Sequence, residues 1–125
     1  MCFVIDPKAK RPKAKFVYKR LMPAATGPKE GWISPYYPGR WKIGMVKKLM
    51  KKTCKPKQNT FLGNPQSHRG FYVYTSRRQA LLKKKPDENV FQMKVNPKDW
   101  CHSSGLVAFG REAVYCKIKV VKRVA

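Results

Sequence analysis

Residues 69–97 read RGFYVYTSRRQALLKKKPDENVFQMKVNP, and they predict a strand, a short helix and a second strand. From Phe71 to Thr75, β-branched or aromatic side chains alternate between two faces with a period of two residues, which is typical of a pleated strand. Residues 89–95 repeat this alternation, with Phe91, Met93 and Val95 on one face. The other elements can be placed around this strand–helix–strand unit.

The segment between these strands has the start and stop signals of a helix. Ser76 followed three residues later by Gln79 is a capping-box pattern, in which each side chain satisfies an amide of the first turn. Residues 80–82 (Ala, Leu, Leu) are expected to form the buried side of the helix. Residues 83–85 are lysines that suit the negative end of the helix dipole, and Pro86 prevents continuation.

Further strands are predicted on both sides of this unit. Residues 16–22 form a first strand, 32–36 a short edge segment, 36–39 a turn, and 40–46 a half-buried strand. The next residues, 46–50, have the spacing of a short basic helix, and 58–69 suit a surface loop. Residues 97–105 predict a turn anchored by Trp100, and 106–109 a short apolar segment. A last strand is expected to place Val114, Cys116, Ile118 and Val120 on a single face.

Strands therefore outnumber helices, and the fold class is α+β. We expect one domain over residues 16–125, a small twisted, mostly antiparallel sheet with one or two short helices. Residues 1–15 include DPKAKRPKAK, which combines basic residues and prolines without apolar periodicity, and they predict a basic extended arm. The sequence contains no internal repeat and no sign of a second domain.

Charge is the most unusual property of the chain. Its 125 residues include 29 Lys and Arg against 6 Asp and Glu, a formal net charge of +23. No acidic residue occurs from Gly31 to Pro86. A surface that served only solubility would normally mix acidic and basic residues over a segment of this length. Self-repulsion of this size favours a partner that is a polyanion or an acidic protein surface.

The basic residues gather in three segments, which are the predicted polyanion-binding sites. These are Lys8, Lys10, Arg11, Lys13 and Lys15 in the arm, Lys47, Lys48, Lys51, Lys52, Lys55 and Lys57 after the middle strand, and Arg77, Arg78, Lys83, Lys84 and Lys85 on the helix. A single lysine is usually a solvated side chain, so only the clusters are informative. Lysines contact phosphates as point charges, which predicts strong salt dependence and little sequence preference.

The sequence offers few residues that could form a catalytic or a metal-binding site. Cys54, His68, Cys101, His102 and Cys116 lack the paired spacing of a zinc site. Neighbouring residues Cys101 and His102 point to opposite faces of a strand, so they form no dyad. We expect no cofactor, no metal and no enzymatic activity. One alternative stays open, because YVYTS (72–76) and the late Glu112 are loosely similar to ADP-ribosyltransferase folds, although the paired Ser-Thr-Ser and Glu-x-Glu patterns are absent.

The order of several short motifs resembles a loosely defined group of small uncharacterised proteins of large eukaryotic DNA viruses and bacteriophages. The motifs are the Met1-Cys2 start, VYK (17–19), ISPYY (33–37), WKIG (41–44), GFYVYTS (70–76), residues 90–95, and the closing strand at 112–121. This resemblance covers nearly the whole chain and implies no enzymatic activity and no catalytic residues. The lysine content exceeds that expected of the group, which favours a specialised polyanion-binding or scaffold role.

Together these observations predict a non-enzymatic basic structural protein of a viral or nucleoprotein particle, such as a minor capsid or virion component. Its partners would be nucleic acid or acidic protein subunits. The alternative is a separate nonspecific DNA- or RNA-binding protein, nuclear or ribosome-associated. No apolar run approaches the ~20 residues of a membrane span and no signal peptide is evident, so the expected location is the virion or the cytoplasm or nucleus of a host cell. The spread of Cys2, Cys54, Cys101 and Cys116 favours reduced thiols.

Overall fold

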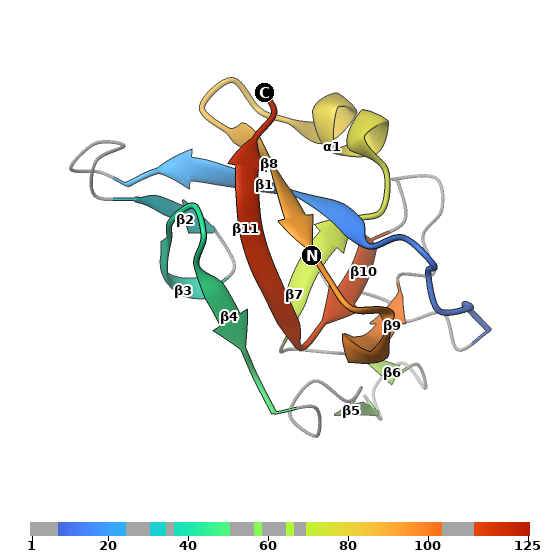
Figure 1. The fold of residues 1–125 in the computed structure, drawn as a ribbon. Coiled ribbons are helices and arrows are strands. Elements are labelled where there is room, and N and C mark those ends of the chain that lie inside the picture. The colour runs from blue at the N-terminus through green and yellow to red at the C-terminus, as the bar shows by residue number, and fades with distance from the viewer. Residues whose placement is uncertain are drawn as a thin grey trace.

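A computed structural model describes residues 8–24, 31–34, 37–50, 57–58, 65–66, 70–103 and 112–125 of the chain (Figure 1). The strands are β1 (Phe16–Pro23), β2 (Trp32–Ser34), β3 (Tyr37–Trp41), β4 (Val46–Lys48), β5 (Lys57–Gln58), β6 (Pro65–Gln66), β7 (Phe71–Tyr74), β8 (Asn89–Lys94), β9 (Trp100–Ser103), β10 (Glu112–Tyr115) and β11 (Lys117–Arg123). The helices are α1 (Arg77–Lys83) and the 3-10 turn η3 (Pro97–Asp99). The described part is mostly β, an antiparallel nine-stranded sheet with one α-helix, in agreement with the small sheet expected from the sequence.

The sheet closes on itself through β10 and β11, which are separated only by Cys116. β11 pairs with β8, β8 with β1, β1 with β7, and β7 with β10, every pair antiparallel. Because β10 leads directly into β11, these strands form a ring around an enclosed interior (Figure 1). β9 extends the β10 side, and β4 extends the β11 side.

The interior of the ring holds the main hydrophobic core. Alternate residues of the strands point inward, such as Val17 and Leu21 of β1, and Phe91 and Met93 of β8, all fully buried. Trp41, at the end of β3, meets the Phe71 ring edge-on at a centroid distance of 5.6 Å. The expectation that Phe91, Met93 and Val95 share one face is therefore confirmed, and that face points into the core.

Helix α1 covers part of the outer face of the sheet. Its Ala80 packs against Tyr74 and Val90, which point away from the main core, and the C-terminal Val124 and Ala125 lie against the same cluster. Figure 1 shows the C-terminus beside this helix. The outer face thus has a covered half near α1 and an open half farther along β8 and β11.

Two details predicted for this helix are wrong. Leu81 and Leu82 are 40% and 67% exposed, because only the Ala80 position of this seven-residue helix faces the sheet. Ser76 is the N-cap residue as predicted, but its side chain makes no capping hydrogen bond. The Ala80 amide instead donates to the Ser76 carbonyl at 3.2 Å, an ordinary first helical bond.

The segment from 36 to 50 differs most from its prediction. The expected turn at 36–39 contains strand β3 from Tyr37, and the expected strand at 40–46 ends at Trp41. A reversal follows, in which Gly44 has a φ of +86°, a conformation that glycine adopts without steric cost. The expected short helix from 46 is instead β4, because Lys47 pairs with Ile118 of β11 and this tertiary pairing overrides weak helical spacing.

The expected final strand is split at Cys116. Ala113 and Tyr115 of β10 lie in the core with Ile118 and Val120 of β11, so the inward-facing positions change from odd to even numbers at Cys116. The prediction that Val114 shares a face with Ile118 is therefore wrong. A change of parity accompanies a local kink, which here lets one stretch of chain pair with both β7 and β8.

The remaining predicted segments are partly described. Residues 97–103 form η3 and strand β9, more regular than the expected turn, and Trp100 Nε1 donates to Ser103 Oγ at 3.0 Å. Within 58–69, described residues include the short β5–β6 pair, whereas 106–109 lie outside the described residues. Residues 8–15 contain neither helix nor strand, and 1–7 lie outside the described residues, so the basic extended arm expected over 1–15 stays a prediction.

Candidate polyanion-binding surface

The described residues of the predicted arm, 8–15, alternate in exposure. Lys8, Lys10, Arg11, Lys13 and Lys15 are exposed, whereas Ala9, Pro12 and Ala14 between them are half-buried. At its end the arm joins the sheet, where the Lys15 carbonyl accepts a hydrogen bond from the Val95 amide at 2.8 Å. The apolar residues thus lie against the protein and the cations point outward.

The middle cluster is only partly described. Lys51, Lys52 and Lys55 lie outside the described residues, and Lys57 belongs to β5 without a described side chain. Lys48 is exposed, but Lys47 turns inward, with its Nζ 4.1 Å from the centre of the Trp41 ring. Burial lowers the pKa of Lys47, and the ring face stabilises its charge. Lys47 is therefore a poor candidate for contacting a phosphate.

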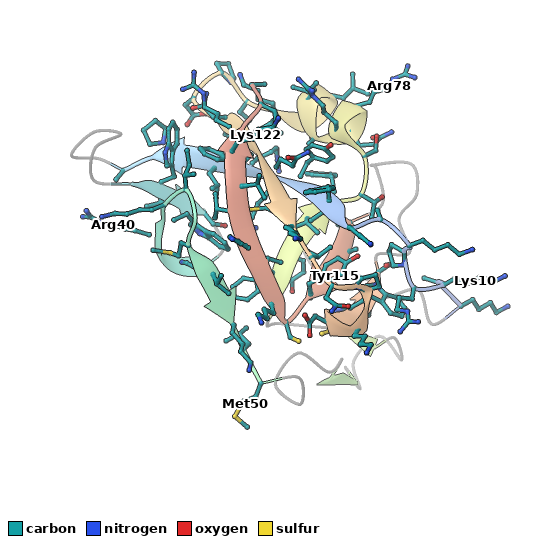
Figure 2. The ribbon with its side chains drawn as sticks, viewed as in Figure 1. Lys10, Arg40, Met50, Arg78, Tyr115 and Lys122 are labelled. Atoms are coloured by element: carbon teal, nitrogen blue, oxygen red, sulfur yellow. The ribbon has the colours of Figure 1, made fainter. Side chains whose placement is uncertain are left out.

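The helix cluster projects at the α1 end of the molecule. Arg77, Arg78 and Lys85 are exposed, and Lys83 and Lys84 are half-buried. Arg77 Nη2 donates to the Val124 carbonyl at 3.3 Å. Figure 2 shows Arg78 and Lys10 extending from separate elements and Arg40 extending from another side of the molecule. The cations grouped by sequence are therefore spread over several sides of the fold.

Strand pairing, in contrast, assembles cations that are distant in sequence. Phe16 of β1 lies opposite Lys94 of β8, Lys94 lies opposite Lys119 of β11, and Lys119 lies opposite Val46 of β4. Residues opposite one another in antiparallel strands share a face. These four exposed side chains form what we call the cross-strand row.

A second lysine pair continues this surface. Lys117 lies opposite Lys48, one outward position along β11 from Lys119. Exposed cations continue along β11 with Lys122 and Arg123, and Lys122 lies near the C-terminal end of that strand (Figure 2). Positive charge therefore covers the open half of the outer face and continues along β11 toward the α1 end.

Two hollows meet at the Lys94–Lys119 pair. The first hollow has a volume of about 490 Å³, and its lining includes Lys15, Lys117 and Asp99 as well as that pair. The second has a volume of about 450 Å³ and is more apolar, with Phe16 and Ile43 in its lining. The surface therefore combines a cationic part with an apolar part that shares its lysines.

Charge in the first hollow is poorly balanced. Among the described residues that line it, Asp99 is the only acidic one, and Asp99 Oδ1 lies 3.9 Å from Cys116 Sγ. Within the described ranges, no ion pair or side-chain hydrogen bond involves Lys15, Lys94, Lys117 or Lys119. Like charges directly opposite one another on a sheet are destabilising. An anion that bound here would relieve this repulsion.

Two other cations, Lys19 and Arg20 of β1, are enclosed by the fold. Lys19 points into the ring between Val17 and Leu21, and its Nζ donates to the Tyr72 carbonyl at 2.8 Å. Desolvation by burial lowers the pKa of Lys19 to about 8, although the Glu112 charge opposes this shift. Arg20 Nη1 lies 3.2 Å from Glu88 Oε1, in an ion pair whose Glu88 side chain is 3% exposed.

Other titratable groups in the core have shifted pKa values. Burial lowers the pKa of His102 to about 4 and raises that of Tyr115 to about 12. The pKa of Tyr74 is also raised, first by burial and then by the Glu112 carboxylate opposite it on β10. In the described part of the chain, no group of three or more His, Cys, Asp or Glu is arranged to hold a metal ion.

Sequence reasoning missed Lys94, Lys117 and Lys119 as candidate binding residues. The alternation in KIKV and QMKV already indicated lysines on the outer faces of strands. The clusters predicted from the sequence are runs along the chain, and a run does not reveal which strands become neighbours. The missing information was the β8–β11 pairing.

Comparisons with protein-family models, curated proteins and solved structures find no match for this chain. Among the described residues, no helix is long and apolar enough to cross a membrane.

Proposed function

We propose that this chain is a non-enzymatic, sequence-nonspecific nucleic-acid-binding protein that acts as a structural component of a nucleoprotein particle, such as a virion. The supporting observation is the Lys94–Lys119 pair beside Lys117–Lys48, with Asp99 as the only acid among the described residues that line the adjoining hollow. Phosphates of a nucleic-acid backbone supply the missing negative charge in a regular array.

Lysine chemistry also defines the specificity of this proposed contact. A lysine ammonium is a compact point charge that attracts phosphate, whereas reading base edges requires placed donors and acceptors in a groove. Most of the side chains that line the two hollows are lysines and apolar groups, with Asn96 and Asp99 in the first hollow. The affinity should therefore fall steeply with salt and vary little among sequences.

The test compares two triple variants that remove the same charge. Lys94→Gln/Lys117→Gln/Lys119→Gln alters the proposed surface, and Arg77→Gln/Arg78→Gln/Lys85→Gln alters the helix cluster. Affinity for labelled mixed-sequence DNA and RNA is measured by fluorescence anisotropy over a range of salt. We expect the first variant to lose affinity and to reduce the slope of log K against log salt by about 2 to 3, because each phosphate contact contributes about 0.7 to 0.9.

The helix variant should reduce the slope by less than half as much. Equal losses in both variants would show that net charge, and not this surface, determines binding. If the unaltered protein bound an acidic polypeptide such as polyglutamate but neither DNA nor RNA, the partner would be an acidic protein and the proposed function would be wrong.

A further inference from the structure

The cross-strand row has an order that phosphate binding alone does not require. Across β1, β8, β11 and β4 it reads Phe16, Lys94, Lys119, Val46, so two lysines lie between apolar side chains. Phe16 is 44% exposed and Val46 is 49% exposed, although both belong to strands of the main sheet. An exposed aromatic ring next to paired lysines matches the chemistry of a nucleotide, which has a flat base and a charged phosphate.

The apolar part of this surface is extended by the reversal between β3 and β4. Ile43 is 63% exposed and lines the second hollow together with Phe16, Lys94 and Lys119. The amide of Gly44 donates to the Val120 carbonyl at 2.8 Å, which holds the reversal against β11. The hollow therefore has anchored apolar walls next to its two lysines.

A second copy of the chain is a poor occupant of this surface. Each copy carries a net charge of +23, and the surface itself is cationic, so two copies would repel one another across it. Double-stranded nucleic acid would satisfy the lysines, but its bases are stacked inside the duplex and cannot reach an exposed ring. Single-stranded nucleic acid offers both groups, because its bases are free to stack on aromatic side chains.

We propose that the cross-strand row binds single-stranded nucleic acid, with phosphate groups on Lys94 and Lys119 and one base stacked on Phe16. This inference rests on the proposed function and deepens it, since it selects single strands over duplexes. Val46 and Ile43 contact the sugar or base on the β4 side. The row itself consists of two lysines and two apolar side chains, which do not read the edges of particular bases, so the preference is for strandedness and not for sequence.

The experiment measures the affinity of Phe16→Ala for a labelled single strand of about 12 nucleotides, within the site sizes of known single-strand binders, and for the matching duplex. Loss of one stacked base should weaken single-strand binding about 10-fold and leave duplex binding within about 2-fold. Phe16→Trp should restore single-strand affinity, because indole keeps a flat stacking face. Thermal unfolding followed by circular dichroism checks that each variant is folded.

Leu82→Ala is the matched control, since Leu82 is an exposed apolar residue on α1, away from the row. It should leave both affinities unchanged. If Phe16→Ala weakened single-strand and duplex binding equally, or neither, the stacking inference would be wrong while nonspecific nucleic-acid binding could stand. If the unaltered protein bound no nucleic acid of either kind, the proposed function itself would fail.

Discussion

Two kinds of cationic side chain occur in this small sheet. Enclosed cations contact protein partners, and open cations are exposed on the outer face. Lys19 and Arg20 of β1 have partners held in place by the fold, the Tyr72 carbonyl for Lys19 and the Glu88 carboxylate for Arg20. Lys94 and Lys119 face one another on β8 and β11 and are exposed. Position in the fold thus decides whether a cation serves stability or association. An enclosed cation affects the folded state, and an open one affects what the protein binds.

The largest expected effect of a single substitution on stability is at the Arg20–Glu88 ion pair. Glu88→Ala removes the partner of Arg20 and the acceptor of the Lys85 amide, whose nitrogen lies 2.8 Å from Glu88 Oε1. Breaking a largely buried ion pair from one side leaves an uncompensated charge, so we expect the free energy of unfolding to fall by about 3 kcal/mol. Urea denaturation measures this loss.

Asp87→Ala is the control for Glu88→Ala, because it removes the same charge from the exposed neighbouring residue. The control should change stability by less than about 0.5 kcal/mol. Similar losses in the two variants would contradict the distinction between enclosed and open charge.

Lys19 should have a smaller effect, which is to make the free energy of unfolding depend on pH. Its pKa of about 8 in the folded protein is below the 10.5 of an unperturbed lysine, so the unfolded chain binds more protons between these values. Stability should therefore rise from pH 7.5 to 9.5, by about 2 kcal/mol. Above pH 10 the raised pKa of Tyr115, about 12, acts in the opposite sense, because the unfolded tyrosine ionises first.

Lys19→Met should abolish this rise in stability, as measured by urea denaturation at a series of pH values. Lys119→Met is the matched control, since it removes the same charge from an exposed site, and it should retain the rise. A rise of unchanged size in Lys19→Met would show that another group produces it.

The smallest effect on stability is expected at the exposed pair Lys94 and Lys119, where substitution should stabilise the protein. Lys94→Gln/Lys119→Gln removes repulsion between directly opposed like charges, so the free energy of unfolding should increase by about 0.5 kcal/mol. Arg77→Gln/Arg78→Gln lowers net charge equally without relieving a cross-strand pair, and it should give a smaller gain. Thermal unfolding of the two variants provides the comparison, and destabilisation by the lysine change would mean that these lysines have a structural role.

Much of the fold could be predicted from local patterns. The strands at 16–22, 71–75 and 89–95 and the helix after Ser76 were predicted close to their observed positions, because alternation and the Pro86 stop are local signals. The segment from 36 to 50 could not be predicted correctly. Its strands depend on partners that are distant in sequence, β2 for β3 and β11 for β4.

For the candidate site, the sequence identified positive charge but not its arrangement. It predicted clusters along the chain, among which Lys47 points to the Trp41 ring and several lysines lie outside the described residues. It did not predict the meeting of Lys94 with Lys119. The kink at Cys116 changes which residues of the last strand face inward, and no composition or run length indicates it.

The amino-acid sequence alone sets the net charge of +23, the alternation of the main strands and the short helix that ends before Pro86, since charge and local periodicity are properties of neighbouring residues. Three features arise only when the chain folds: the sheet closes through β10 and β11, Lys19 is enclosed, and Phe16, Lys94, Lys119 and Val46 form one row. The physical reason is that backbone pairing between distant strands sets the register, and the register decides which side chains share a face.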